Sequence, residues 1–286
     1  MGHIWQTPTI STSPKWVILL KYIEILAHLP FQLDSEYPEV DGPLSITSYI
    51  TALDNSYSRF REKHARAQGR REKLAGTNGH VNGHANGQNG HANGNGHTNG
   101  TASSKAVISL ADFDYPIFHS PYGKLVQKGH ARLLYNDFVA NPADPRFASV
   151  PTPEEFLALS PAQSIKSKEL EKAFVGVAAA DYKKRVAPGM SLAKRCGNMY
   201  TASLYGGLVS LVSNVEPSEL LGKRISMFAY GSGCASSFYA IRVKGDTTEI
   251  REKIDLKNRI QAMKVVPCEE YVSSLKVSLF FHSLMC

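Results

Sequence analysis

The sequence predicts an α/β protein whose helices pack in layers against a small sheet. Two apolar runs, residues 224–230 and 238–243, have the length and composition of β-strands and flank a short stretch of small residues. Three segments, 46–60, 125–138 and 199–212, carry apolar residues at three- and four-residue steps, as amphipathic helices do. Helices that precede neighbouring strands are typical of layered α/β folds.

Length and composition describe a globular protein. The chain has 286 residues, of which 43% are hydrophobic and 20% charged. Its longest apolar run, residues 16–29, is interrupted by Lys21 and Glu24 and is too short to cross a bilayer. The run also lacks the small-residue cleavage site of a secretory signal. We therefore expect a cytoplasmic protein with no membrane partner.

One segment, residues 77–102, consists almost entirely of Asn, Gly, His and Ala. Such a composition cannot bury enough apolar surface to offset the entropy of ordering, so we expect a disordered insert. Its histidines have no Cys or carboxylate partners nearby, and no metal site is expected. The four cysteines lack CxxC spacing and are expected to be reduced: Cys196, Cys234, Cys268 and Cys286. Cys196 and Cys234 are further expected to be small buried thiols.

The first predicted helix begins after a turn-rich segment, and Ser45 stands where an N-cap is expected. Its apolar positions include Ile46, Ile50 and Leu53. A basic run follows at 59–73. We expect a solvated helix face there rather than a site for phosphate or nucleic acid.

His119 follows the apolar pair at 117–118 and precedes the second predicted helix. A histidine at a helix start lies beside unpaired N–H groups, and its imidazole can donate to a carbonyl oxygen. A lone histidine is nevertheless more often a hydrogen-bonded structural group. Lys124 and Lys128, four residues apart, share one helix face and could attract phosphate groups.

Small residues fill the stretch 231–237, so the backbone there can approach either a packed strand or a ligand. The third predicted helix directly follows Cys196, Gly197 and Asn198. Neither Cys196 nor Cys234 has a histidine at a spacing that would mark it as a nucleophile.

Four long blocks resemble, in order, the 3-hydroxy-3-methylglutaryl-CoA (HMG-CoA) synthases. The likeness spans 34–275 apart from the insert. The blocks are SEYPEVDGPLSITSYITALDNSYSRF, DYPIFHSPYGKLVQKGHARLLYNDF, CGNMYTASLYGGLVSLVSN and GKRISMFAYGSGCASSFYAIRV. Long blocks in register are far more specific than any single motif above.

The resemblance implies a thiolase-like layered fold, of which this chain holds the C-terminal half only. It also implies an acyltransferase that condenses acetyl-CoA with acetoacetyl-CoA and water to give HMG-CoA, in the mevalonate pathway of isoprenoid and sterol biosynthesis. No cofactor is expected, because the CoA thioesters are substrates. In that family a cysteine is acetylated and a glutamate removes a proton from the acetyl methyl group.

Individual positions match the family's site residues. His119, in FHSPY, matches the histidine that binds the acetoacetyl thioester and aids the addition. Ser45, in PLSI, matches a serine that contacts the ligand. The remaining matches are two lysines that meet the CoA moiety and two polar residues that hold the acyl portion: Lys124, Lys128, Asn198 and Ser232.

The resemblance places the family's cysteine and glutamate in sequence that precedes Ser35, and residues 1–33 do not resemble it. We expect 1–33 to be a non-homologous leader and 276–286 a non-homologous tail, both products of a truncated or mispredicted gene. The chain alone is then an inactive fragment with His119 as its catalytic residue. The alternative is a non-catalytic acyl-CoA-binding or synthase-associating module. The family forms homodimers, but the oligomeric state stays open.

Overall fold

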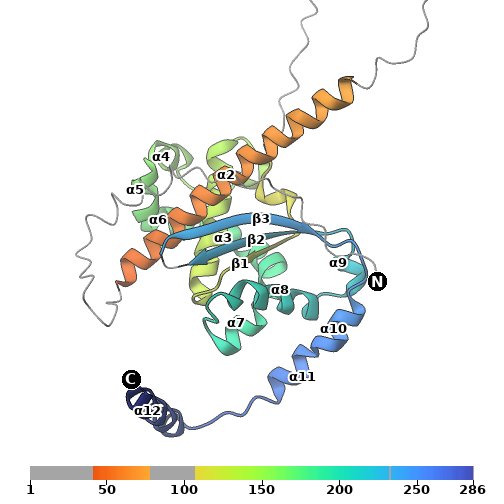
Figure 1. Cartoon of the computed structure of the whole chain (residues 1–286). Helices are drawn as coiled ribbons and strands as arrows, with labels where there is room; N and C mark the ends of the chain where they lie inside the picture. Colours follow the sequence, from red (N-terminus) through yellow and green to blue (C-terminus); the bar gives the residue numbers. More distant parts are fainter. Residues whose placement is uncertain (1–40, 78–106, 232, 286) are drawn as a thin grey trace, which may run out of the picture.

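A computed structural model describes residues 41–77, 107–231 and 233–285 (Figure 1). The predicted leader, most of the predicted insert and Ser232 lie outside the described residues. None of the helices in the described ranges combines the length and the hydropathy that crossing a bilayer requires.

A three-stranded sheet lies at the centre, in the order β1-β2-β3. β1 (Tyr115–Phe118) runs parallel to β2 (Arg224–Gly231), and β2 pairs in antiparallel fashion with β3 (Ala235–Arg242). Both strands predicted from the apolar runs are confirmed. β3 begins three residues earlier than predicted because the small residues at 235–237 continue the ladder opposite the end of β2.

Helices cover both faces of the sheet, which confirms the layered arrangement. α2 (Gly42–Thr77) and α3 (Gly123–Ala140) lie on one face, and α8 (Ala202–Asn214) lies on the other (Figure 1). Successive strand side chains point to opposite faces, so Phe228 joins the core under α2 and α3, whereas Met227 joins the core under α8.

α2 begins one turn earlier than the sequence suggested. The side chain of Asp41 accepts a 2.9 Å hydrogen bond from the backbone N–H of Leu44, so Asp41 acts as the cap. The prediction of Ser45 as N-cap is wrong, because Ser45 lies inside the first turn and donates its hydroxyl to the carbonyl of Asp41. Tyr49 and Leu53 are fully buried on the face that meets the sheet.

The second half of α2 extends beyond the body of the protein and carries the basic run (Figure 1). Arg59 and Arg66 are mostly exposed there, with 61% and 71% of their side-chain surface accessible, as a solvated face requires. Arg61 differs. Its guanidinium is largely buried and lies 3.8 Å from the carboxylate of Asp137.

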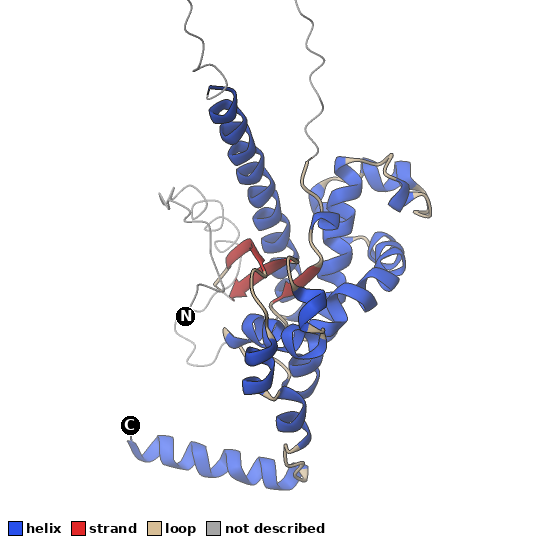
Figure 2. Ribbon diagram, turned by 90° about the vertical axis from the view of Figure 1, so that its right-hand side faces the viewer, coloured by secondary structure: helices blue, strands red, loops and turns tan. Residues whose placement is uncertain are grey.

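The remaining helices connect these layers. α6 (Lys168–Asp181) packs against α3, and α12 (Cys268–Met285) stands apart from the body in both views (Figure 2). The other helical segments are η2 (Leu110–Asp112), η3 (Pro145–Phe147), α4 (Pro153–Ala158), α5 (Pro161–Lys166), η4 (Tyr182–Val186), η5 (Ala187–Met190), α7 (Ser191–Cys196), α9 (Pro217–Leu220), α10 (Thr248–Ile254) and α11 (Leu256–Gln261).

Candidate functional site

His119 directly follows β1, and its backbone is held from two sides. Its N–H donates a 2.8 Å hydrogen bond to the carbonyl of Phe228 on β2, which extends the parallel ladder by one residue. Its own carbonyl accepts a 2.9 Å hydrogen bond from the hydroxyl of Tyr49 on α2. The hydrogen bonds to β2 and from α2 therefore fix the backbone of the residue that carries the imidazole.

The imidazole of His119 lies in a nearly dry environment, since the residue is only 7% exposed. Its ring centre is 6.1 Å from that of Tyr230, near the end of β2. Burial disfavours the charged imidazolium and lowers the pKa of His119 below its ordinary value. A neutral imidazole has one N–H donor and one acceptor nitrogen, so the ring can donate to a carbonyl oxygen at neutral pH.

β1 and β2 run parallel toward the same edge of the sheet, where β1 ends opposite Phe228 and β2 continues for three more residues. His119 follows β1, while Gly231 ends β2 and leads into the turn to β3. Ser232, the predicted acyl-contacting residue, lies outside the described residues. Cys234, two residues further on, is half-buried and has a left-handed backbone with φ of 62°.

Asn198 lies in the loop between α7 and α8. α8 leads through α9 into the start of β2, so its first turn points back toward the edge where His119 lies (Figure 1). The Oδ1 atom of Asn198 accepts hydrogen bonds from the backbone N–H of Tyr200 at 2.9 Å and the hydroxyl of Ser203 at 3.2 Å. Its exposed amide NH₂ is thus the group that can face a ligand.

The two predicted CoA-binding lysines lie on α3, which begins four residues after His119. Lys124 is exposed in the first turn. Lys128 follows one turn later, and its Nζ is 3.0 Å from the Oε1 of Glu171 on α6. The helix confirms that both lysines share one face, but their electrostatic surroundings differ.

Ser45 lies one helical turn before Tyr49 on nearly the same side of α2. It is exposed, and its hydroxyl proton is used in the 2.7 Å bond to the carbonyl of Asp41. Ser45 can therefore offer a ligand its oxygen lone pair. Ser45 precedes by one turn Tyr49, whose hydroxyl holds the backbone of His119.

A partly buried polar cluster beside β1 was missed at the level of sequence. The Nε2 of His130, on α3, is 2.8 Å from the Oδ2 of Asp181. Arg185 donates to both oxygens of the same carboxylate and also to the carbonyls of Leu110 and Phe113 before β1. The cluster thereby ties two helices to the segment that leads into the strand carrying His119.

Contacts within this cluster favour the charged form of Asp181. Burial opposes ionisation of Asp181, but the hydrogen bonds from His130 and Arg185 outweigh it and hold the pKa of Asp181 well below its usual range. The Nδ1 of His130 is buried with no hydrogen-bond partner in the described part of the chain. The one signal in the sequence was a histidine on the apolar face of a helix, four residues after Val126.

The cysteines differ in part from expectation. Cys196, Cys234 and Cys268 are free thiols, and Cys234 is half-buried, but Cys196 is exposed, so the expectation of a buried thiol is wrong for Cys196. Cys196 is the last residue of the short α7, where the chain turns at Gly197. Within the described ranges, no group of three or more His, Cys, Asp and Glu side chains could hold a metal.

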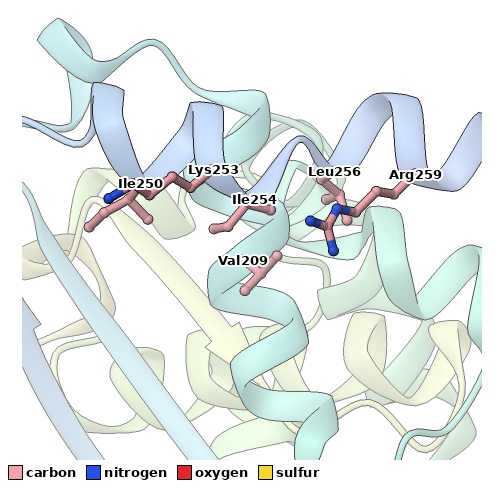
Figure 3. Close-up of a pocket in the computed structure, with 6 residues that line it drawn as sticks. All are labelled: Val209, Ile250, Lys253, Ile254, Leu256 and Arg259. Atoms are coloured by element: carbon pink, nitrogen blue, oxygen red, sulfur yellow. The ribbon is translucent and has the colours of Figure 1, made fainter.

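A shallow hollow between α8, α10 and α11 lies away from this site. Four apolar side chains line it, with Lys253 and Arg259 beside them: Val209, Ile250, Ile254 and Leu256 (Figure 3). α10 follows the end of β3, which pairs with the start of β2, whereas His119 lies beyond the end of β1. The hollow contains none of the predicted site residues.

Fold and site together define a layered α/β protein with a buried, neutral histidine at the carboxyl edge of a mixed sheet. The family model described as hydroxymethylglutaryl-coenzyme A synthase C terminal matches residues 28–83 and 92–284. The chain belongs to this family.

Two similar relatives are fungal. The chain is 55% identical over 244 residues to a hydroxymethylglutaryl-CoA synthase of Ganoderma lucidum, a match that covers 85% of this chain and 46% of the relative. It is 45% identical over 251 residues to one of Mycosarcoma maydis, covering 88% of this chain and 49% of the relative. The chain thus spans about half the length of the curated relatives it matches.

One solved structure, MvaS in complex with 3-hydroxy-3-methylglutaryl coenzyme A, superposes with a TM-score of 0.57 at 29% identity. The superposition covers 86% of this chain and 46% of that chain. The predicted family and the thiolase-like fold of its C-terminal half are confirmed. The boundaries of leader, insert and tail, and the roles of the individual site residues, stay predictions.

Proposed function

We propose that this chain serves the HMG-CoA synthase reaction as the half that binds the acetoacetyl-CoA thioester, with His119 as its catalytic residue. The observation that carries the proposal is the buried His119, neutral and fixed between the hydroxyl of Tyr49 and the carbonyl of Phe228. The complex of the MvaS relative with HMG-CoA supports a CoA thioester as the ligand.

The chemistry follows from the state of the imidazole. When a carbanion adds to the acetoacetyl ketone, negative charge grows on the carbonyl oxygen. A donor already oriented toward that oxygen in a dry site stabilises the charge without reorganisation. The neutral ring of His119 can supply that N–H, and the amide of Asn198 and the hydroxyl of Ser232 are assigned to the rest of the acyl group.

The CoA moiety is assigned to the start of α3. The first turn of this helix offers unpaired backbone N–H groups, and Lys124 adds a positive charge beside them. Ser45 contributes an acceptor from the first turn of α2. CoA phosphates at α3 and an acyl group at His119 are compatible, because only three residues separate His119 from the helix.

The condensation joins acetyl-CoA and acetoacetyl-CoA with water to give HMG-CoA and free CoA, as a step of the mevalonate pathway in the cytoplasm. The proposal assigns the acetylated cysteine and the glutamate base to the other half of the family's sequence. Homodimers, as in the family, are part of the proposal.

The alternative is a non-catalytic module that binds acyl-CoA or associates with an intact synthase. It is favoured by one observation, namely that the match covers only 46% of the Ganoderma relative. Both functions share a CoA thioester as ligand, and they differ in whether the chain takes part in turnover.

Calorimetric titration with acetoacetyl-CoA tests the proposal. The wild-type chain should bind, and His119→Ala should bind at least ten-fold more weakly, the effect of losing one hydrogen bond to a charged or polarised group. His64→Ala is the matched control, since His64 lies on α2 with its ring 6.2 Å from that of Phe60. Equal affinities of the wild-type and His119→Ala proteins would refute the assignment of His119.

A further inference from the structure

Three cations form a row along one face of α3. Lys124, Lys128 and Arg132 follow one another at four-residue steps, which places them on neighbouring turns. Arg132, deepest in the row, is held by both carboxylate oxygens of Asp54 at 2.8–3.0 Å. Its charge is therefore already compensated within the protein.

The middle cation, Lys128, is also compensated. Its Nζ lies 3.0 Å from the Oε1 of Glu171, and the two side chains are only 22% and 34% exposed. Both residues line a small cavity between α2, α3, α5 and α6, together with Arg132 and Ser164. Because α3 packs against α6, the carboxylate of Glu171 is held at a fixed place beside the lysine.

Lys124 has different surroundings, because it is exposed in the first turn of α3 and next to the unpaired N–H groups of the helix start. Along the row, positive charge available to an outside anion thus decreases from Lys124 inward. A phosphate that approached Lys128 would meet the negative charge of Glu171 within a few ångströms of the ammonium group.

We infer that Glu171 is a positioning residue for CoA: it weakens phosphate attraction at Lys128 and thereby directs the phosphates to the Lys124 end of the row, nearest His119. This inference rests on the proposed function. If the phosphates of acetoacetyl-CoA bound one turn deeper along α3, its thioester would be displaced by about 6 Å, the rise of four helical residues. Glu171 therefore influences where the thioester lies relative to the imidazole.

The test compares Glu171→Gln with the wild-type chain, using acetoacetyl-CoA and phosphate-free acetoacetyl-pantetheine as ligands. Glu171→Gln should bind acetoacetyl-CoA about two- to five-fold more tightly, the range expected for removing one charge at a partly exposed pair. Affinity for acetoacetyl-pantetheine should not change. Glu171→Asp keeps the charge and should bind acetoacetyl-CoA as the wild type does.

Two further variants complete the design. Glu169→Gln removes the same charge from an exposed position on the same helix and should leave the affinity for acetoacetyl-CoA within a factor of about 1.5. In a Lys128→Ala background, Glu171→Gln should lose most of its effect, because the two residues act as a pair.

The outcomes separate the inference from the function on which it rests. Unchanged or weaker binding of acetoacetyl-CoA by Glu171→Gln, with a binding-competent wild type, would overturn the inference and leave the proposed function intact. An equal gain with acetoacetyl-pantetheine would also overturn it, since the effect would not depend on phosphate. Absence of any acetoacetyl-CoA binding by the wild-type chain would overturn both.

Discussion

The hydroxyl of Tyr49 donates a 2.9 Å hydrogen bond to the carbonyl of His119, across 70 residues of sequence. Tyr49 lies on α2 before the predicted insert, and His119 follows β1 after it. The ring of Tyr49 also packs edge-on against Phe228, whose carbonyl accepts the N–H of His119. One tyrosine therefore holds the backbone of the proposed catalytic residue to the helix above the sheet.

Replacing Tyr49 with Phe should disturb the site as well as the fold. The carbonyl of His119 would lose its buried donor, which costs about 1–3 kcal/mol of unfolding free energy. Acetoacetyl-CoA binding should weaken too, because the segment that carries His119 is less restrained. Urea denaturation and calorimetric titration measure the two effects.

Tyr57→Phe is the matched control, since Tyr57 is equally buried on α2 and its hydroxyl donates to the carboxylate of Asp137 at 2.8 Å. It should lower stability to a similar degree and leave affinity for acetoacetyl-CoA within two-fold. If both variants lost affinity equally, the effect would reflect general loosening and not the bond to His119.

The burial of His119 predicts a pH-dependent stability. Its folded pKa is lowered by burial, so the unfolded chain binds the proton at higher pH than the folded chain does. Above the unfolded pKa of about 6.5, His119 is neutral in both states and does not reduce the unfolding free energy. As the pH falls below that value, the unfolded chain takes up a proton and the unfolding free energy decreases. Urea denaturation of the wild type should show a lower unfolding free energy at pH 5.5 than at pH 7.5.

Variants assign this loss to particular residues. His119→Asn should reduce the difference in unfolding free energy between the two pH values. Burial lowers the pKa of His64 as well. Adding His64→Asn to His119→Asn should therefore reduce the difference in unfolding free energy further. If the unfolding free energy of His119→Asn differed between pH 5.5 and pH 7.5 by as much as that of the wild type, burial of His119 would not be a cause of the pH dependence.

The contact between α8 and β1 requires glycine at position 207. A Cβ added at Gly207 would lie 2.6 Å from the Cγ2 of Ile117 on β1 and 3.4 Å from the carbonyl of Gly189. Gly207→Ala should therefore cost about 1–3 kcal/mol by overpacking, measured as a lower urea midpoint. Gly176→Ala, on α6 with nothing within 4 Å of the new Cβ, should be neutral or stabilising.

The isolated chain should have negligible turnover. The family's nucleophilic cysteine and glutamate base are assigned to the other half of its sequence, and His119 alone cannot form the acetylated intermediate. Chromatographic detection of HMG-CoA after incubation with both substrates measures this. Appreciable product would contradict the fragment hypothesis, and Cys196→Ser and Cys234→Ser would then identify the nucleophile.

The local features of the fold and the site could largely be predicted from the sequence. The strands at 224–230 and 238–243 and the helix after His119 follow from apolar patterns, and the resemblance selected His119 from the other histidines. The cap of α2 was predicted at Ser45 instead of Asp41, because both residue types cap helices and only the backbone shows which one precedes the first turn.

The contacts between distant segments of the chain could not be predicted. The pairs His130–Asp181 and Lys128–Glu171 join α3 to α6 through residues about 40–50 positions apart, and a single sequence does not show which helix faces meet. Both lysines on α3 were expected to be available to CoA. The structure distinguishes them only because Glu171 lies beside one of them.

The most direct test of the central claim is a ¹⁵N NMR titration of the histidine side chains with acetoacetyl-CoA. If His119 binds the acetoacetyl carbonyl, its ring nitrogens should shift on titration with acetoacetyl-CoA and with acetoacetyl-pantetheine, whereas those of buried His130 and of His64 should change little. Assignment comes from the loss of signals in His119→Gln. A saturating ligand that leaves the ring nitrogens of His119 unshifted would contradict the account.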